Sequence, residues 1–102
     1  MNAQTERARI AGPVGTIEIA IDHPADREAP VGVVVLSHPH PLFGGTMDNK
    51  VVQTMVRAFL QMGWRTVRHN FRGVGASEGT HDEGRGESED LLAVIAAHRL
   101  PG

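Results

Sequence analysis

VGVVVLS, at residues 31–37, is apolar up to its final serine and rich in β-branched valine. A strand of this composition is typically covered on both faces, and such strands are usually central and parallel in their sheet. The next segment, HPHPLFGGTMDN at 38–49, holds two prolines and a Gly-Gly pair, which exclude regular structure. In open parallel sheets, ligands bind in the crevice outside the carboxyl ends of the strands. The two segments therefore predict an α/β sheet with a ligand site after residue 37.

The segments before this strand predict an antiparallel pair. TIEIAID at 16–22 alternates isoleucines with other residues, which indicates a half-buried strand near a sheet edge. TERARI at 5–10 alternates more weakly, and we expect it to pair with 16–22 across the turn-like AGPVG. HPADREAP at 23–30 is polar with two prolines, so we expect a loop there.

A helix and a fourth strand are expected after the loop. The helix would begin with Asp48 as its N-cap and stop at Gly63. Its apolar residues at helical spacing are Val52, Met55, Val56, Phe59 and Leu60. WRTVRHNF at 64–71 then predicts another strand.

The remaining segment predicts a loop followed by a last helix. RGVGASEGTHDEGRG at 72–86 is rich in glycine, which favours a loop. The helix is expected to run from Glu87 or Ser88 to about Arg99, where Pro101 prevents its continuation. Its expected apolar stripe is Leu91, Leu92, Ile95 and Ala96.

Composition excludes several classes of protein. The 102 residues suit a single domain over 1–102, with 10 basic and 12 acidic residues and no basic stripe that would indicate nucleic acid. The chain has no cysteine, so disulfides and thiolate metal sites are excluded. The first residues lack the apolar core of a signal peptide, and no apolar run approaches the ~20 residues that span a bilayer. We expect a cytoplasmic protein with no membrane partner.

The loop after residue 37 has the chemistry of an oxyanion site. Pro39 and Pro41 have no N–H and fix φ on both sides of His40, so the His40 N–H has a restricted direction. Pre-aimed donors of this kind stabilise developing oxyanions. The other backbone donors of the loop are His38, Leu42, Phe43, Gly44 and Gly45. A rigid turn with no catalytic duty is the alternative.

His38 and His40 raise the alternative of a metal site. In an extended segment two residues at this spacing lie on one side of the chain. Zinc usually needs three protein ligands, and no third one is identifiable nearby. We therefore expect no metal and no cofactor.

GASEG at 75–79 matches G-x-S-x-G, the pattern of the nucleophile elbow of serine hydrolases. That elbow requires a strand directly before the serine and a helix directly after it, whereas Ser77 lies inside the expected loop. A triad of Ser77, Asp82 or Asp90, and His98 has an allowed order. However, His98 would lie ~16 Å along the last helix from its start. We expect Ser77 not to be the nucleophile.

Other roles of this loop follow from its charges. The run GVGASEG fails the phosphate-binding pattern G-x-G-x-x-G, because Glu78 occupies the third glycine position. Glu87 and Asp90 lie where a helix N-terminus stabilises negative charge. We expect either of them to pair with Arg72 or Arg85 and to fix the loop.

Three motifs in series resemble the N-terminal half of α/β-hydrolases: HPHPLFGGTMDNKVV at 38–52, RHNFRGVGASEG at 68–79 and DEGRGESEDLLAVI at 82–95. More narrowly, they are similar to small bacterial hydrolases related to the dienelactone-hydrolase and serine-aminopeptidase branches. The resemblance spans roughly residues 10–100, and the series is more specific than any one motif. It implies the N-terminal part of an α/β-hydrolase sheet, in the order β-β-β-α-β-α, truncated before the nucleophile strand.

The resemblance also implies site residues. The backbone N–H of His40 would be the oxyanion donor, and Asn70 would stand where most of the superfamily carries Asp. The residues implied to shape the loops and the pocket are His38, Pro39, Pro41, Gly44, Gly45, Asn70, Arg72, Gly73, Gly75 and Ser77. The triad order of the superfamily is Ser, then Asp or Glu, then His, and all three are expected beyond Gly102.

The implied function is a serine hydrolase that acts on ester, thioester or amide bonds of a small-molecule substrate through an acyl-enzyme. The alternative is a non-catalytic α/β module that binds a small molecule at the same strand ends. Oligomeric state stays open. In the truncated sheet, the strand at 31–37 would expose an apolar edge, which favours aggregation. We therefore do not expect residues 1–102 alone to unfold cooperatively as a monomer.

Overall fold

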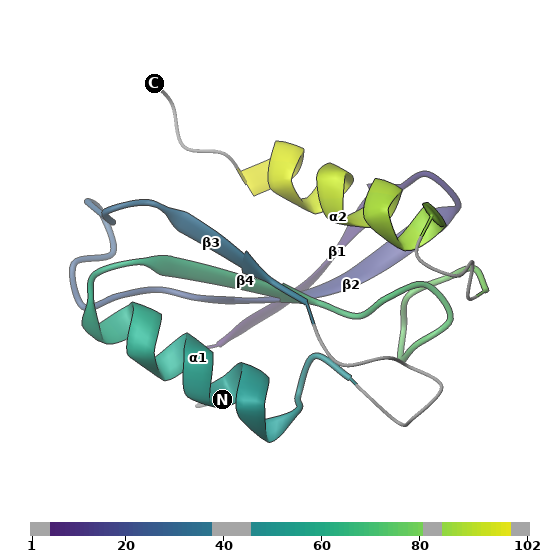
Figure 1. The fold of residues 1–102 in the computed structure, drawn as a ribbon. Coiled ribbons are helices and arrows are strands. Elements are labelled where there is room, and N and C mark those ends of the chain that lie inside the picture. Colours follow the sequence, from purple (N-terminus) through teal and green to yellow (C-terminus); the bar gives the residue numbers. More distant parts are fainter. Residues whose placement is uncertain (1–4, 38–45, 81–84, 99–102) are drawn as a thin grey trace.

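The fold is known from a computed structural model, which describes residues 5–37, 46–80 and 85–98. Its elements follow the predicted order β-β-β-α-β-α (Figure 1). They are β1 (Glu6–Gly12), β2 (Gly15–Asp22), β3 (Val33–Leu36), α1 (Lys50–Gln61), β4 (Arg65–His69) and α2 (Arg85–His98).

The four strands form one mixed sheet in the order β1-β2-β4-β3. β1 and β2 form the predicted antiparallel hairpin, in which Gly12 lies opposite Gly15 across a two-residue turn. β2 is also antiparallel to β4, and β4 is parallel to β3. A parallel pair requires a crossover, which α1 supplies.

The two helices cover opposite faces of this sheet (Figure 1). Because side chains alternate along a strand, the buried apolar residues divide into two clusters. The cluster on the α2 side is Ile17, Ile19, Val67 and Val94. The cluster on the α1 side is Leu36, Val52 and Val56. The core is thus two thin layers with the sheet between them.

Helix α1 follows its sequence pattern closely. Val52 and Val56 are buried, and the other three expected apolar residues pack against them. The helix stops where predicted, with Gly63 at φ +89°, a conformation that favours glycine. The predicted N-cap was wrong by one residue. The Asn49 side chain accepts the bond from the Val51 N–H at 2.8 Å, whereas the Asp48 carboxylate accepts from Arg7 and Arg68.

The strand at 31–37 is shorter and less covered than predicted. Only Val33–Leu36 is extended, and Leu36 alone is buried. β3 is parallel as expected, but it lies at the end of the sheet that the described residues form rather than at its centre. Val31 lies outside the strand, with its N–H bonded to the Gly63 carbonyl at 2.9 Å. Gly32 is in turn closely approached by the Trp64 ring.

The apolar stripe predicted for the last helix was wrong. The buried residues of α2 are Gly86, Glu87, Asp90 and Val94, and the helix begins at Arg85. Leu92 and Ile95 are 65% and 38% exposed. Similarly, β2 is not half-buried along its whole length, since Ala20 and Asp22 on its second face are buried too. In both cases charged residues occupy buried positions, which apolar periodicity cannot reveal.

Paired substitutions distinguish the observed face of α2 from the predicted one. Val94→Ala should destabilise α2 by about 1–3 kcal/mol, because it leaves a cavity in the core. Leu92→Ala should change its stability by no more than about 0.5 kcal/mol, because that side chain is exposed in this chain. Hydrogen exchange of the α2 amides measures both. Equal losses in the two variants would contradict the observed orientation.

Candidate functional site

Residues 68–72, the β4 end, bring together most of the polar contacts near the predicted ligand site. Arg68, His69, Asn70 and Arg72 are all buried. Because side chains alternate along an extended chain, Arg68 and Asn70 lie on the α1 side of the sheet, and His69 lies on the other. Arg68 and Asn70 share one partner, Met47, whereas His69 contacts Ser37 and Arg72 contacts α2.

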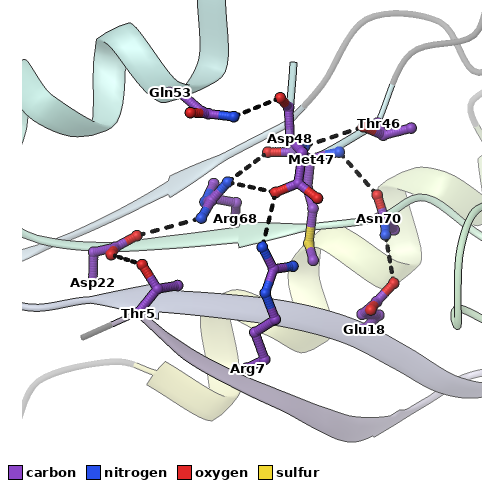
Figure 2. Close-up of polar contacts among 10 residues, drawn as sticks. All are labelled: Thr5, Arg7, Glu18, Asp22, Thr46, Met47, Asp48, Gln53, Arg68 and Asn70. Atoms are coloured by element: carbon purple, nitrogen blue, oxygen red, sulfur yellow. Dashed lines mark hydrogen bonds and ion pairs between the residues drawn. The ribbon is translucent and has the colours of Figure 1, made fainter. Parts of the chain in front are cut away.

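Arg68 is fully buried and bonded to the segment that leads into α1 (Figure 2). Its Nη1 donates to the Met47 carbonyl at 3.1 Å and to Asp48 Oδ1 at 2.9 Å. Its Nη2 lies 3.6 Å from Asp22 Oδ2, at the end of β2. A buried guanidinium requires such partners, since an unpaired charge inside a protein is strongly unfavourable.

Asp48 is shared by two cations. Arg7 from β1 also donates to Asp48 Oδ1, at 3.2 Å (Figure 2). Burial raises the pKa of the Asp48 carboxyl, but Arg7 and Arg68 act in the opposite direction and hold this pKa below its ordinary value. The stabilisation from this carboxylate is therefore present above its ordinary pKa, and is lost as the pH falls through the lowered pKa of the folded state.

Asn70 uses both ends of its side-chain amide (Figure 2). Its Oδ1 accepts from the Met47 N–H at 2.9 Å, and its Nδ2 donates to Glu18 Oε1 at 2.6 Å. The same Glu18 oxygen accepts from the Ala76 N–H at 2.9 Å. An aspartate at position 70 would place a second carboxylate against Glu18. This contact gives a physical reason for the departure from the superfamily's usual Asp.

Ser77 is buried in the loop after β4, and its hydroxyl is bonded to main-chain groups. Its Oγ donates to the Asn70 carbonyl at 2.8 Å and accepts from the Glu18 N–H at 2.8 Å. His98, the base of the triad considered above, instead contacts the Val94 carbonyl through Nδ1 at 3.1 Å. Asp82 lies outside the described residues. The described residues thus do not bring Ser77 and His98 together.

Further contacts attach this loop to β2. The Thr16 N–H donates to Glu78 Oε1, and the Glu78 N–H donates to the Thr16 carbonyl, both at 2.7 Å. The bond from the Thr16 N–H lowers the pKa of Glu78. Gly75 has φ +54°, and a Cβ there would lie 2.5 Å from the Glu18 carboxylate and 2.6 Å from the Asn70 amide. Glycine is therefore required where the loop crosses these side chains.

Arg72 fixes the start of α2, which confirms one of the pairings expected for it. Its Nε and Nη2 donate to the two oxygens of Asp90 at 3.0 and 2.8 Å, and Nη2 also donates to the Gly86 carbonyl at 2.7 Å. Such bidentate pairs set both distance and orientation. A Cβ on Gly86 would overlap the guanidinium, so this approach depends on glycine.

His69 contacts the residue that precedes the predicted oxyanion loop. Its Nε2 lies 3.2 Å from Ser37 Oγ, within hydrogen-bond distance, and its ring packs edge-on against Phe71 at a centroid distance of 5.3 Å. The predicted loop residues themselves lie outside the described part of the chain. They are His38, Pro39, His40, Pro41, Gly44 and Gly45. The structure therefore shows the residues that flank this loop and their partners.

Three other features bear on function. Within the three described ranges, no group of three or more His, Cys, Asp or Glu side chains is placed to hold a metal ion. Neither helix of the described residues is long and apolar enough to cross a bilayer. An open pocket of ≈ 390 Å³ is lined by Asp48, Lys50, Gln53, Thr54 and Arg57. None of the predicted site residues lines this pocket.

Residues 15–96 match the family model described as X-Pro dipeptidyl-peptidase (S15 family). The chain belongs to this S15 family. An α/β serine hydrolase homologue from Coxiella burnetii is 47% identical and superposes on 95% of the chain with a TM-score of 0.86. An α/β serine hydrolase without a lid from Xanthomonas campestris is 39% identical over 97% of the chain, with a TM-score of 0.82. An uncharacterized protein of Rickettsia prowazekii is 42% identical over 84 residues, or 82% of the chain.

These similarities confirm the α/β-hydrolase resemblance of the three motifs. The S15-family chain corresponds to the N-terminal part of that fold. It spans 45% and 47% of the two hydrolase structures, and 34% of the Rickettsia protein.

Two residues of this site, Glu18 and Arg68, were not identified from the sequence. Alternation placed Glu18 on the polar face of its strand, where it would be solvated, yet it accepts bonds from two other segments. Arg68 was predicted only as part of the strand at 64–71, with no role of its own. A charged residue inside an otherwise extended pattern was the available signal in both cases.

Asn70→Asp should destabilise the chain by about 2–3 kcal/mol, because it exchanges a charge-assisted hydrogen bond for two facing carboxylates. Hydrogen exchange of the Met47 and Ala76 amides, which donate to Asn70 and Glu18, measures this loss locally.

Glu18→Gln provides the matched control. In the double variant Glu18→Gln/Asn70→Asp, the glutamine amide can donate to the new carboxylate, so the double variant should be more stable than the sum of the two single losses predicts. Strictly additive losses would contradict the proposed reason for asparagine at position 70.

Proposed function

We propose that this chain forms the N-terminal half of a bacterial serine hydrolase that acts on ester, thioester or amide bonds of small molecules. The observation that carries this proposal is the superposition of 95% of the chain on a serine hydrolase homologue at 47% identity. At this identity a shared fold and a related chemistry are both expected. The match of residues 15–96 to a peptidase family also supports hydrolysis of a carbonyl compound.

In this proposal the chain supplies one donor of the oxyanion hole. A serine hydroxyl attacks the substrate carbonyl, whose oxygen becomes negatively charged in the tetrahedral intermediate. The backbone N–H of His40 would donate to that oxygen, and such a donor typically stabilises the transition state by about 3–4 kcal/mol. Collapse of the intermediate releases the leaving group and leaves an acyl-enzyme, which water then hydrolyses. We place the nucleophile, the base and its orienting acid outside residues 1–102.

We assign Ser77 a structural role in this hydrolase. An activated serine needs a base within hydrogen-bond reach of its hydroxyl. The hydroxyl proton of Ser77 instead faces the Asn70 carbonyl, in a buried position. Its bonds to Asn70 and Glu18 hold the loop against β2, and the motif GASEG then reflects loop geometry and not catalysis.

The class of scissile bond is part of the proposal. The name of the matching family favours a peptide bond that follows proline, whereas the two hydrolase structures are named only as serine hydrolases. The Xanthomonas hydrolase is described as lacking a lid. We favour small esters and place the enzyme in the cytoplasm, which a chain without cysteine fits.

Expression of the complete reading frame tests the proposal. The purified protein should hydrolyse p-nitrophenyl butyrate, and a fluorophosphonate should label one serine outside residues 1–102, identified by mass spectrometry. Residues 1–102 alone should give neither turnover nor label. Stoichiometric label on Ser77 would overturn the assignment. Binding of small esters with neither turnover nor label in the complete protein would favour the non-catalytic binding module instead.

A further inference from the structure

Helix α1 carries two basic residues, Lys50 and Arg57, and no acidic one. Both are exposed, and they lie on the same side of the helix, because a spacing of seven residues is about two helical turns. Neither side chain has a hydrogen-bond or ion-pair partner in the part of the chain that the structure describes. By contrast, other arginines pair with carboxylates, among them Arg7, Arg68 and Arg72. The two charges of α1 are therefore available to a ligand.

The two cations line the open pocket of ≈ 390 Å³ together with Asp48, Gln53 and Thr54. Ligand pockets for small molecules typically have volumes of about 300–1,000 Å³. The residues of the pocket lie on the side of α1 that is turned away from Val52 and Val56, which pack toward the sheet. A ligand in this pocket would therefore contact α1 without displacing any part of the core.

Asp48 does not cancel the two charges of α1. Its carboxylate is already shared by Arg7 and Arg68, at 3.2 and 2.9 Å (Figure 2), and these arginines hold its pKa below the ordinary value. Arg68 also lies 3.6 Å from Asp22. Around the pocket, four cations thus stand against two carboxylates. The excess of positive charge favours an anionic ligand.

The other two polar side chains of the pocket have their donors engaged. Gln53 Nε2 donates to the Asp48 carbonyl at 2.7 Å, and Thr54 Oγ1 donates to the Lys50 carbonyl at 2.9 Å. The oxygens of both side chains remain able to accept hydrogen bonds. Hydroxyl groups of a ligand would supply the matching donors. An anion that also carries hydroxyls therefore matches the pocket better than a bare anion does.

We propose that this pocket binds a small phosphate monoester that carries hydroxyl groups. Its phosphate lies between Lys50 and Arg57, and its hydroxyls contact Gln53 and Thr54. A phosphate monoester carries a charge of about −1.5 to −2 at neutral pH, which matches two cations, and its oxygens can accept two bonds from one guanidinium. The site is independent of the proposed hydrolase chemistry, since none of its residues takes part in that chemistry.

Titration calorimetry of the complete protein with glycerol 3-phosphate tests this site. Binding should saturate at one molecule per chain and should be about threefold or more tighter than that of inorganic phosphate, because the glycerol hydroxyls add hydrogen bonds. Lys50→Gln and Arg57→Gln should each weaken binding about tenfold, because each removes a charge-assisted bond. Their melting temperatures should stay unchanged, because both side chains are exposed. Lys50→Arg keeps the charge and should retain most of the affinity.

Arg85→Gln is the matched control. It removes one positive charge from an exposed side chain at the start of α2, which covers the opposite face of the sheet (Figure 1), and should leave the affinity unchanged. Equal weakening by Arg85→Gln would indicate non-specific attraction and would overturn the site. Binding that does not saturate, or that survives both Lys50→Gln and Arg57→Gln, would also overturn it.

The remaining outcomes separate the ligand class and the two proposals. Inorganic phosphate that binds as tightly as glycerol 3-phosphate would overturn the assignment of a hydroxylated ester. Turnover of p-nitrophenyl butyrate should be the same in the wild type and in Lys50→Gln and Arg57→Gln. A wild-type protein that binds glycerol 3-phosphate in this pocket but has no turnover would overturn the proposed function and support this inference.

Discussion

The side-chain amide of Asn70 is the contact on which the arrangement of the loops depends. Its oxygen accepts from Met47 at the start of α1, and its nitrogen donates to Glu18 on β2. The Asn70 main chain is bonded too, since its N–H donates to the Glu18 carbonyl and its own carbonyl accepts from Ser77. One residue at the end of a strand thus joins β2, the loop after β4 and the segment before α1. A side-chain amide supplies the acceptor for Met47 and the donor for Glu18 at once, whereas an ionised carboxylate could only accept.

The two arginines of the β4 end likewise join segments that are distant in the sequence. Arg68 reaches Asp22 and Asp48, and Arg72 reaches Asp90 at the start of α2. Each guanidinium is buried and paired with carboxylates from distant parts of the sequence. Since a buried ion pair adds little net stability but is costly to break, such pairs favour one arrangement of the segments over others. The loops around a strand end are therefore held by directional contacts and not by the thin apolar core.

The sequence predicted those features that depend on local pattern. The period of α1, the alternation of β2 and the glycines of the 72–86 loop each indicate their own structure. The orientation of α2 was not predictable in this way, because it follows from the Arg72–Asp90 pair, which buries an acid at a position that periodicity assigns to solvent. The role of Glu18 depends likewise on Asn70 and Ala76, more than 50 residues away. The three motifs in series identified the fold because they contain residues of these distant pairs, among them Asn70, Arg72 and Asp90.

Hydrogen exchange at the Met47 amide tests the central claim most directly. If Asn70 holds the segment before α1, the Met47 N–H should be protected in the wild type and should exchange at least about tenfold faster in Asn70→Ala. The amides of Val56 and Phe59 within α1 should keep their protection, because they are bonded inside the helix. An unchanged Met47 rate, or an equal loss of protection throughout α1, would contradict the account.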